Sequence, residues 1–280
     1  MSSASSIRSL LFAPGNDARM LEKALESGAD AVVADLEDAV PASEKGRARE
    51  IVRDLIAGAH TETLLAVRLN AVGTAFWEDD LRMLSAFPPG ALVLPKATPE
   101  GVAALGVDGP PVIGIAETAE GLRLAYETAR SPRTVALVLG AVDLGLELGL
   151  EPRPDGQEVL FARSKLVVDS IAAGIRSPFD LVHVDLRDDE GLEAECRLAR
   201  SLGLRGKACI HPAQVEIVNR VFSPSDEEAD RARRIVRAYE QGRAEGRGVV
   251  SLDGKMIDLP VVERARQVLA ASERSPSDEY

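Results

Sequence analysis

Short apolar runs recur along this chain, and each is followed by a longer amphipathic or charged segment. Several runs are apolar along their whole length, which is typical of parallel strands covered on both faces. Successive strand-then-helix units of this kind predict an α/β protein with a (β/α)8 TIM barrel. The predicted strands are residues 7–13, 30–35, 64–70, 91–95, 112–117, 134–140, 181–185 and 206–210.

An open, doubly wound sheet is the alternative architecture. It is the less favoured one, because no G-x-G-x-x-G motif follows a predicted strand. The nearest candidate, LGAVDLGLELG (139–149), lacks the spacing and places Asp143 where a phosphate would lie. We therefore expect a barrel over residues 1–222.

The chain continues beyond what barrel closure needs. Helical patterns at about 226–246 and 260–272 flank the segment RGVVSLDGKMIDLP (247–260). We expect residues 223–273 to form a helical extension that serves either as packing or as a lid. The polar residues 274–280 are predicted to be a disordered tail.

Composition excludes several classes of function. With 33 basic and 45 acidic residues the net charge is −12, which argues against a nucleic-acid binder because phosphate contacts need Lys and Arg. No apolar run reaches the length of a membrane helix, and the N-terminus lacks the pattern of a signal peptide. Cys196 and Cys209 form no C-x-x-C pair. A soluble protein of the reducing cytoplasm is therefore expected.

Ionisable or polar residues follow nearly every predicted strand. In a barrel the carboxyl ends of the strands converge on one mouth, so these side chains are expected to form one mixed cluster. Packing alone does not explain apolar strands that end in charges. The residues are Asp35, Glu37, Asp38, Arg68, Asn70, Lys96, Glu117, Asp143, Asp185 and His211.

Two of these acids form a candidate metal site. Glu117 and Asp143 follow neighbouring apolar strands. Two hard oxygen ligands without His or Cys companions suit Mg²⁺, or Mn²⁺, which fills its other positions with water or substrate oxygens. The alternative is that each residue caps the next helix, as Asp often does.

The basic residues suggest how an anion is held. Arg68 lies inside an apolar strand and needs an anionic partner, either a substrate carboxylate or Asp35, Glu37 or Asp38. These roles can coexist, the acids orienting Arg68 and Lys96. A Schiff base on Lys96 is the weaker interpretation, because nearby carboxylates raise a lysine pKa.

Two further basic residues have two interpretations. Arg19 and Lys23 share a helix face four residues apart, either as a solvated pair or as phosphate contacts. Trp77 and His60 are interpreted as surface or packing residues.

The motifs together resemble the citrate lyase β-subunit-like family, which includes malyl-CoA and citramalyl-CoA lyases. The resemblance runs from about residue 7 to residue 270, with the motifs in order. They are RSLLFAPGN (8–16), DLEDAVPASEKGRAR (35–49), VRLN (67–70), LPKA (94–97), IAETAEGL (115–122), LVLGAVDL (137–144), GKACIHPAQ (206–214) and DGKMIDLP (253–260).

The resemblance implies a barrel of the phosphoenolpyruvate/pyruvate type. It implies that Glu117 and Asp143 hold Mg²⁺ and that Arg68 binds the carboxylate of an oxo acid such as oxaloacetate or glyoxylate. Asp258 matches an acid that a neighbouring subunit supplies from its lid, usually within a trimer. The residues that match coenzyme A contacts are Phe12, Arg19, Lys23, Ile210 and His211.

The activity implied is cleavage or formation of a 3-hydroxy acyl thioester of the citryl-, malyl- or citramalyl-CoA type. The products are an acyl thioester, on CoA or on an acyl carrier, and a 2-oxo acid such as oxaloacetate, glyoxylate or pyruvate. Mg²⁺ and Arg68 would meet the developing negative charge, and Asp258 would move the thioester α-proton. Two alternatives stay open: a malyl-CoA thioesterase on the same scaffold, and a metal- and oxo-acid-binding subunit of a larger lyase complex.

Overall fold

The computed structural model describes residues 7–58 and 63–272. Its contacts divide the chain into two compact units, Met1–Phe222 and Ser223–Tyr280. His60 and the predicted tail 274–280 lie outside the described residues.

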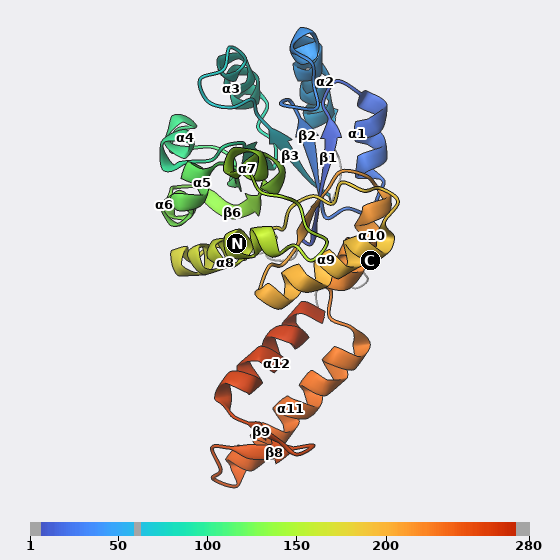
Figure 1. The fold of residues 1–280 in the computed structure, drawn as a ribbon, viewed down its shortest axis with the longest axis vertical. Helices are drawn as coiled ribbons and strands as arrows, with labels where there is room; N and C mark the ends of the chain where they lie inside the picture. Colours follow the sequence, from blue (N-terminus) through green and yellow to red (C-terminus); the bar gives the residue numbers. More distant parts are fainter. Residues whose placement is uncertain (1–6, 59–62, 273–280) are drawn as a thin grey trace. The chain divides into compact units, whose positions relative to one another are not determined.

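The first unit is built on seven parallel strands in the order β6-β5-β4-β3-β2-β1-β7. This order confirms the predicted barrel, and Figure 1 shows the helices arranged around the strands. The strands are β1 (Ser9–Pro14), β2 (Ala31–Asp35), β3 (Leu64–Arg68), β4 (Ala91–Leu94), β5 (Val112–Ala116), β6 (Thr134–Leu139) and β7 (Lys207–Cys209).

The gap between β6 and β7 is closed by two residues. Phe179 bridges Val138 of β6, and Asp180 bridges Lys207 of β7, both in parallel. The prediction of a strand at 181–185, the seventh of eight, is therefore wrong. The closing segment lies just before it and is too short to count as a strand.

Buried charges hold the closing segment in place. Arg163 donates to the Asp180 carboxylate over 2.8 Å, and Lys207 Nζ lies 2.9 Å from Asp180 and 2.8 Å from Glu195. Burial alone would raise the pKa of Asp180, but Lys207 and Arg163 hold it below its ordinary value. Ion pairs from a helix and a neighbouring strand thus take the place of a longer backbone ladder.

Alternate residues of the strands fill the barrel interior. Small side chains face larger ones there, with alanines on five strands set against Leu10, Val33, Val93, Ile113 and Phe179. The opposite faces of the same strands pack under the helices. Burial on both faces explains why the strand sequences are apolar throughout.

The helices that cover the strands mostly follow the predicted amphipathic segments. The α-helices are α1 (Ala18–Leu25), α2 (Lys45–Gly58), α3 (Trp77–Ala86), α4 (Pro99–Ala104), α5 (Ala119–Arg123), α6 (Ala125–Arg130), α7 (Ala141–Leu148), α8 (Leu160–Ala173), α9 (Asp189–Leu202) and α10 (Ala213–Phe222). Two 3₁₀ turns, η1 (Ala42–Glu44) and η2 (Gln157–Val159), precede α2 and α8. Trp77 is buried at the start of α3, as a packing residue.

The second unit is a pair of helices joined by a hairpin. It contains α11 (Asp226–Ala244), the antiparallel strands β8 (Val250–Leu252) and β9 (Lys255–Ile257), and α12 (Leu259–Ser272). Ser225 and Glu228 form a capping box at the start of α11. Asp253 and Gly254 both have positive φ, as a tight two-residue hairpin turn requires. Tyr239, Val250, Ile257 and Val262 form its core.

Among the described helices, none has both the length and the apolar character needed to cross a membrane.

Candidate active site

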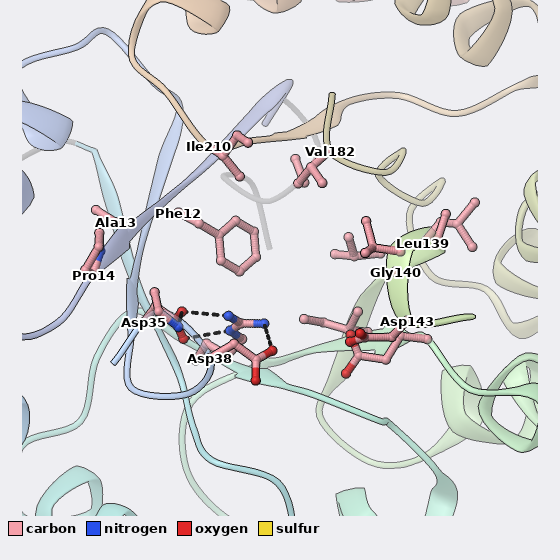
Figure 2. Close-up of a pocket in the computed structure, with 18 of the residues that line it drawn as sticks. Phe12, Ala13, Pro14, Asp35, Asp38, Leu139, Gly140, Asp143, Val182 and Ile210 are labelled. Carbon is pink, nitrogen blue, oxygen red and sulfur yellow. Dashed lines mark hydrogen bonds and ion pairs between the residues drawn. The ribbon is translucent and has the colours of Figure 1, made fainter. Parts of the chain in front are cut away.

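The carboxyl ends of the strands surround a cavity of about 380 Å³. Figure 2 shows Ile210 and Val182 on one side of it, and the carboxylates of Asp35, Asp38 and Asp143 on the other. The charged residues that line it are Asp35, Asp38, Arg68, Glu117 and Asp143. The others are Phe12, Ala13, Pro14, Met20, Ala39, Ile115, Val138, Leu139, Gly140, Ala141, Val142, Val182, Ala208 and Ile210.

Arg68 is held rigidly by the acid opposite it in the sheet. Asp35, at the end of β2, pairs in register with Arg68 at the end of β3. Arg68 donates from Nε to Asp35 Oδ1 over 2.7 Å and from Nη2 to Oδ2 over 2.6 Å. Backbone N–H groups of Glu37 and Ala39 donate to the same carboxylate and orient it. Burial would lower the pKa of Arg68, but its bonds to Asp35 raise it, so the guanidinium stays charged.

Two more acids face the third nitrogen of Arg68. Its Nη1 lies 3.0 Å from Glu37 Oε2 and 3.7 Å from Asp38 Oδ2. Burial raises the pKa of Glu37 to about 8, against the opposing effect of Arg68. The Lys45 ammonium donates to the carbonyls of Leu36 and Glu37, which fixes the turn that carries these acids. The predicted partner of Arg68 was either a substrate carboxylate or one of the acids Asp35, Glu37 and Asp38. In this structure the acids are its partners.

Glu117 directly follows β5 and is held by backbone groups. Its Oε1 accepts from the N–H of Lys96 over 2.8 Å. Lys96 has a φ of +47, a left-handed conformation that costs energy in a non-glycine residue. Burial raises the pKa of Glu117 to about 7, and the charge of Asp143 adds to this rise. The Lys96 side chain is exposed and does not line the cavity.

Gly140 leaves the space that Glu117 occupies. A Cβ at Gly140 would lie 2.4 Å from Glu117 Cβ and 2.9 Å from its Oε2. Only glycine allows the β6–α7 connection to pass this close to the carboxylate. The glycine of LVLGAVDL is the signal for this feature in the sequence.

Neither candidate metal ligand caps a helix. Thr118 caps α5 and accepts from Gly121 N–H, whereas Asp143 lies inside the first turn of α7, after its cap Gly140. The capping alternative for Glu117 and Asp143 is therefore wrong. Their carboxylates line one cavity, and the charge of Asp143 adds to the rise that burial gives the pKa of Glu117.

A divalent cation fits this pair. Both are hard oxygen donors, and a cation between them would relieve their repulsion. Within the described ranges, no group of three or more His, Cys, Asp or Glu forms a closed metal cage. The donor set therefore suits an ion that keeps positions for water or substrate oxygens.

The predicted coenzyme A contacts divide into two groups. Phe12 and Ile210 line the cavity, and the Phe12 ring lies 5.4 Å from the Arg68 guanidinium carbon. Arg19, Lys23 and His211 are exposed and do not line it. Of these, His211 accepts at Nδ1 from Ala213 N–H.

Besides Lys96 and His211, two further strand-end residues do not line the cavity. Asn70 is buried and donates to Asp80 over 2.7 Å, so it serves the β3–α3 connection. Asp185 is exposed, in the turn that precedes α9, and accepts from Arg187 N–H.

Asp258 belongs to the second unit, where its carboxylate accepts from Val261 N–H over 3.3 Å at the start of α12. Its catalytic assignment stays a prediction.

The apolar wall of the cavity was missed by reasoning from strand-end charges. Ile115, Val138, Val182 and Ala208 belong to it. All four lie in predicted strands, but those strands are apolar on both faces, so the sequence carries no signal that separates these residues from the core.

The site belongs to a class of barrel enzymes whose functional residues come from the carboxyl ends of several strands. The chain is a member of the HpcH/HpaI aldolase/citrate lyase family, which it matches over residues 8–212. Residues 161–273 match a second family, described as C–C bond lyase of the TIM-barrel fold. The resemblance stated from the sequence motifs is thereby confirmed.

Relatives within the family carry specific names. A (3S)-malyl-CoA thioesterase of Cereibacter sphaeroides is 39% identical over 95% of this chain and 94% of its own length. The protein CitE of Mycobacterium tuberculosis, solved with magnesium, acetoacetate and coenzyme A, superposes with a TM-score of 0.85 at 34% identity, covering 97% of this chain and 100% of that one. A citrate lyase beta subunit of M. tuberculosis, solved with oxaloacetate and magnesium, gives 0.72 at 35% identity, covering 80% and 100%.

Proposed function

We propose that this chain is a Mg²⁺-dependent carbon–carbon lyase. It cleaves or forms a 3-hydroxy acyl thioester, and the products are an acyl thioester and a 2-oxo acid such as oxaloacetate, glyoxylate or pyruvate. The observation that carries the proposal is one cavity lined by Arg68, which Asp35 holds in place, and by Glu117 and Asp143, neither of which caps a helix. Relatives solved with magnesium, coenzyme A and oxaloacetate support it.

Glu117 and Asp143 are the residues that would hold Mg²⁺, with Mn²⁺ as a substitute. When bound, the ion supplies Lewis-acid polarisation of the oxo acid's carbonyl. The backbone N–H of Lys96 keeps Glu117 oriented before the ion arrives. Removal of the metal with EDTA should abolish turnover, and added Mg²⁺ should restore it.

Arg68 binds the carboxylate of the oxo acid in this proposal. Asp35 engages Nε and Nη2, so the side chain needs no reorganisation to meet a substrate. The N–H groups that face neither Asp35 nor Glu37 are the ones available to the ligand. Asp35, Glu37 and Asp38 act as positioning residues for this guanidinium.

The thioester enters past the apolar rim of Phe12 and Ile210. Arg19, Lys23 and His211 are exposed polar residues that would contact the coenzyme A portion, while an acyl carrier is the alternative donor. Asp258 from the C-terminal unit would move the α-proton of the thioester. Supply of Asp258 by a neighbouring subunit requires a homo-oligomer, which we propose to be a trimer or a dimer of trimers.

The cytoplasm is the proposed location. The thiols of Cys196 and Cys209 are unpaired and buried, as in a reducing compartment.

Thioester hydrolysis is the second candidate. It is favoured by the 39% identical relative that is named (3S)-malyl-CoA thioesterase. The same cavity would then position water against the thioester carbonyl. A role as the oxo-acid-binding subunit of a larger lyase complex is the third, in line with the neighbour named citrate lyase beta subunit.

Product analysis distinguishes these candidates. Purified protein with Mg²⁺ is incubated with citryl-, malyl- and citramalyl-CoA, and products are measured by mass spectrometry. A 2-oxo acid with an acyl-CoA identifies a lyase, whereas a hydroxy acid with free CoA identifies a thioesterase. If every thioester stays intact, the stand-alone lyase proposal is wrong.

A further inference from the structure

Two neighbouring segments continue beyond the point where the barrel closes, and both reach the cavity. Val182 follows the closing segment and Ile210 follows β7, and each lines the cavity (Figure 2). The last backbone hydrogen bond between the two segments runs from the Ala208 N–H to the Asp180 carbonyl over 3.0 Å. Among the described residues, no backbone hydrogen bond joins 181–183 to 209–211. The position of these two segments therefore depends on side chains.

The side chain of Gln214 joins the two segments. Gln214 is 5% exposed and lies in the first turn of α10. Its Oε1 accepts from the backbone N–H of Ile210 over 2.9 Å and from that of His211 over 3.3 Å. Its Nε2 donates to the carbonyl of His183 over 2.8 Å. Among the described side chains, Gln214 alone has hydrogen bonds to both segments.

The chemistry of the partners fixes the orientation of this amide. A backbone N–H can only donate and a carbonyl can only accept, so Oε1 has to face Ile210 and Nε2 has to face His183. Side chains of similar size cannot replace it, because ionised Glu has no donor and Met has no N–H and only a weak acceptor. Loss of the amide would leave these backbone groups without partners and would favour movement of both segments.

A second contact holds only one of the segments. His183 Nδ1 lies 3.2 Å from Glu195 Oε1 on α9. This contact anchors 181–183 but does not reach Ile210. Gln214 therefore remains the link that sets the position of one segment relative to the other.

We propose, on the basis of the thioester function above, that Gln214 is a positioning residue for the thioester. By joining the two segments it keeps Val182 and Ile210 at the part of the cavity edge that the thioester passes. Gln214 does not line the cavity itself, and none of its hydrogen bonds reaches Arg68 or the proposed metal ligands. It should therefore act on thioester binding and not on the chemical step.

Kinetics and binding of the full-length Gln214→Met variant in Mg²⁺ test this. The KM for the thioester that wild type turns over should rise about tenfold with kcat nearly unchanged, the pattern of a lost interaction that ground state and transition state share. Binding of free coenzyme A, measured by calorimetric titration, should weaken by a similar factor, whereas Mg²⁺ binding should not change. An unchanged KM and coenzyme A affinity in the folded variant overturn the proposal.

Hydrogen exchange measures the link directly. The Ile210 N–H should exchange faster in Gln214→Met than in the wild type, as followed by mass spectrometry. Gln214→Glu keeps an acceptor for this N–H but lacks the donor to the His183 carbonyl, so it should protect Ile210 and still weaken coenzyme A binding. Equal exchange at Ile210 in all three proteins overturns the proposal.

Val218→Ala controls for a general loss of stability. Val218 is fully buried on the same helix and packs in the core away from the cavity. This variant should lower the midpoint of urea denaturation at least as much as Gln214→Met but should keep the wild-type affinity for coenzyme A. If it weakens coenzyme A binding equally, the effect of Gln214→Met is one of stability alone and the proposal is wrong.

Failure of the thioester function gives a different result. In that case the wild type turns over no thioester, while coenzyme A affinity and exchange at Ile210 still respond to Gln214→Met. A wild type that neither binds coenzyme A nor turns over any thioester overturns both proposals together.

Discussion

At the scale of single residues, the candidate metal site depends on one missing side chain. Gly140 lies where a Cβ would overlap Glu117 and Ile115. Glu117 is also fixed by the N–H of Lys96, so it has little freedom to move away. The geometry of this carboxylate is therefore set by backbone groups of two neighbouring loops.

Gly140→Ala should weaken Mg²⁺ binding by about tenfold to a hundredfold, the size of effect that disturbed ligand orientation has in metal sites. Calorimetric titration with Mg²⁺ measures this. Gly145→Ala, in α7, is the matched control, because its Cβ would meet only Leu150 at 3.9 Å. If both variants bind Mg²⁺ like the wild type, Gly140 has no role in orienting Glu117.

Glu37 is a second residue whose environment has a measurable consequence. Its folded-state pKa of about 8 lies above the ordinary 4.5. Between these pH values the unfolded chain releases the proton and the folded chain keeps it. The free energy of unfolding therefore falls as pH rises through this window, by up to about 1.4 kcal/mol per pH unit.

Glu37→Gln should flatten this fall in stability. Chemical denaturation from pH 5 to pH 8, in EDTA so that Glu117 carries no metal, measures the slope for both proteins. Glu100→Gln, an exposed change on α4, serves as the control. Parallel curves for wild type and Glu37→Gln would show that the buried acid does not keep its proton.

At the scale of secondary-structure elements, the barrel is closed by charge as much as by strand pairing. Phe179 and Asp180 supply only two bridges between β6 and β7. Asp180 is fully buried between Arg163 of α8 and Lys207 of β7. This short segment leads to Val182 in the apolar wall, so the closure also positions one side of the cavity.

Asp180→Asn should cost roughly 3–5 kcal/mol of stability, because it leaves the buried Arg163 with a neutral partner and the buried Lys207 with Glu195 as its anionic partner. Urea denaturation monitored by circular dichroism measures the loss. Arg153→Gln breaks an exposed pair with Asp155 and should leave the midpoint unchanged. A midpoint for Asp180→Asn within error of the wild type would contradict a structural role for the buried pair.

At the scale of the whole molecule, the chain consists of two compact units with separate cores. The proposed metal ligands and Arg68 belong to the first, and the proposed acid Asp258 belongs to the second. A reaction that needs both units can draw them from one chain or from two.

Mixed oligomers distinguish these cases. Asp258→Asn should lower turnover by about 10²–10⁴-fold, as removal of an acid–base group does. Arg68→Gln should abolish turnover, because the oxo acid loses its carboxylate partner. When the two inactive variants are unfolded and refolded together, activity should return if Asp258 acts on a neighbouring barrel. Each variant refolded alone is the control. A lack of recovery in confirmed mixed oligomers would place Asp258 on its own barrel or outside the reaction.

The sequence predicted most of the barrel strands but not the segment that closes the barrel. Seven of the predicted strands were found because strands buried on both faces are apolar throughout, which is visible in local sequence. The closing segment was missed because Asp180 is charged and looks like the end of an element. Its partners, Arg163 and Lys207, are close only in the folded chain.

The sequence by itself indicated the charged groups that line the cavity, because the carboxyl ends of parallel barrel strands converge there. It also indicated Asn70, Lys96, Asp185 and His211, which do not line it. It did not determine their partners. Arg68 pairs with Asp35 because β2 and β3 align these two residues in register. The apolar wall likewise consists of residues that look like ordinary core positions. Only the tertiary structure decided that they face a cavity, because apolar side chains of the same types elsewhere in the barrel are covered by their neighbours.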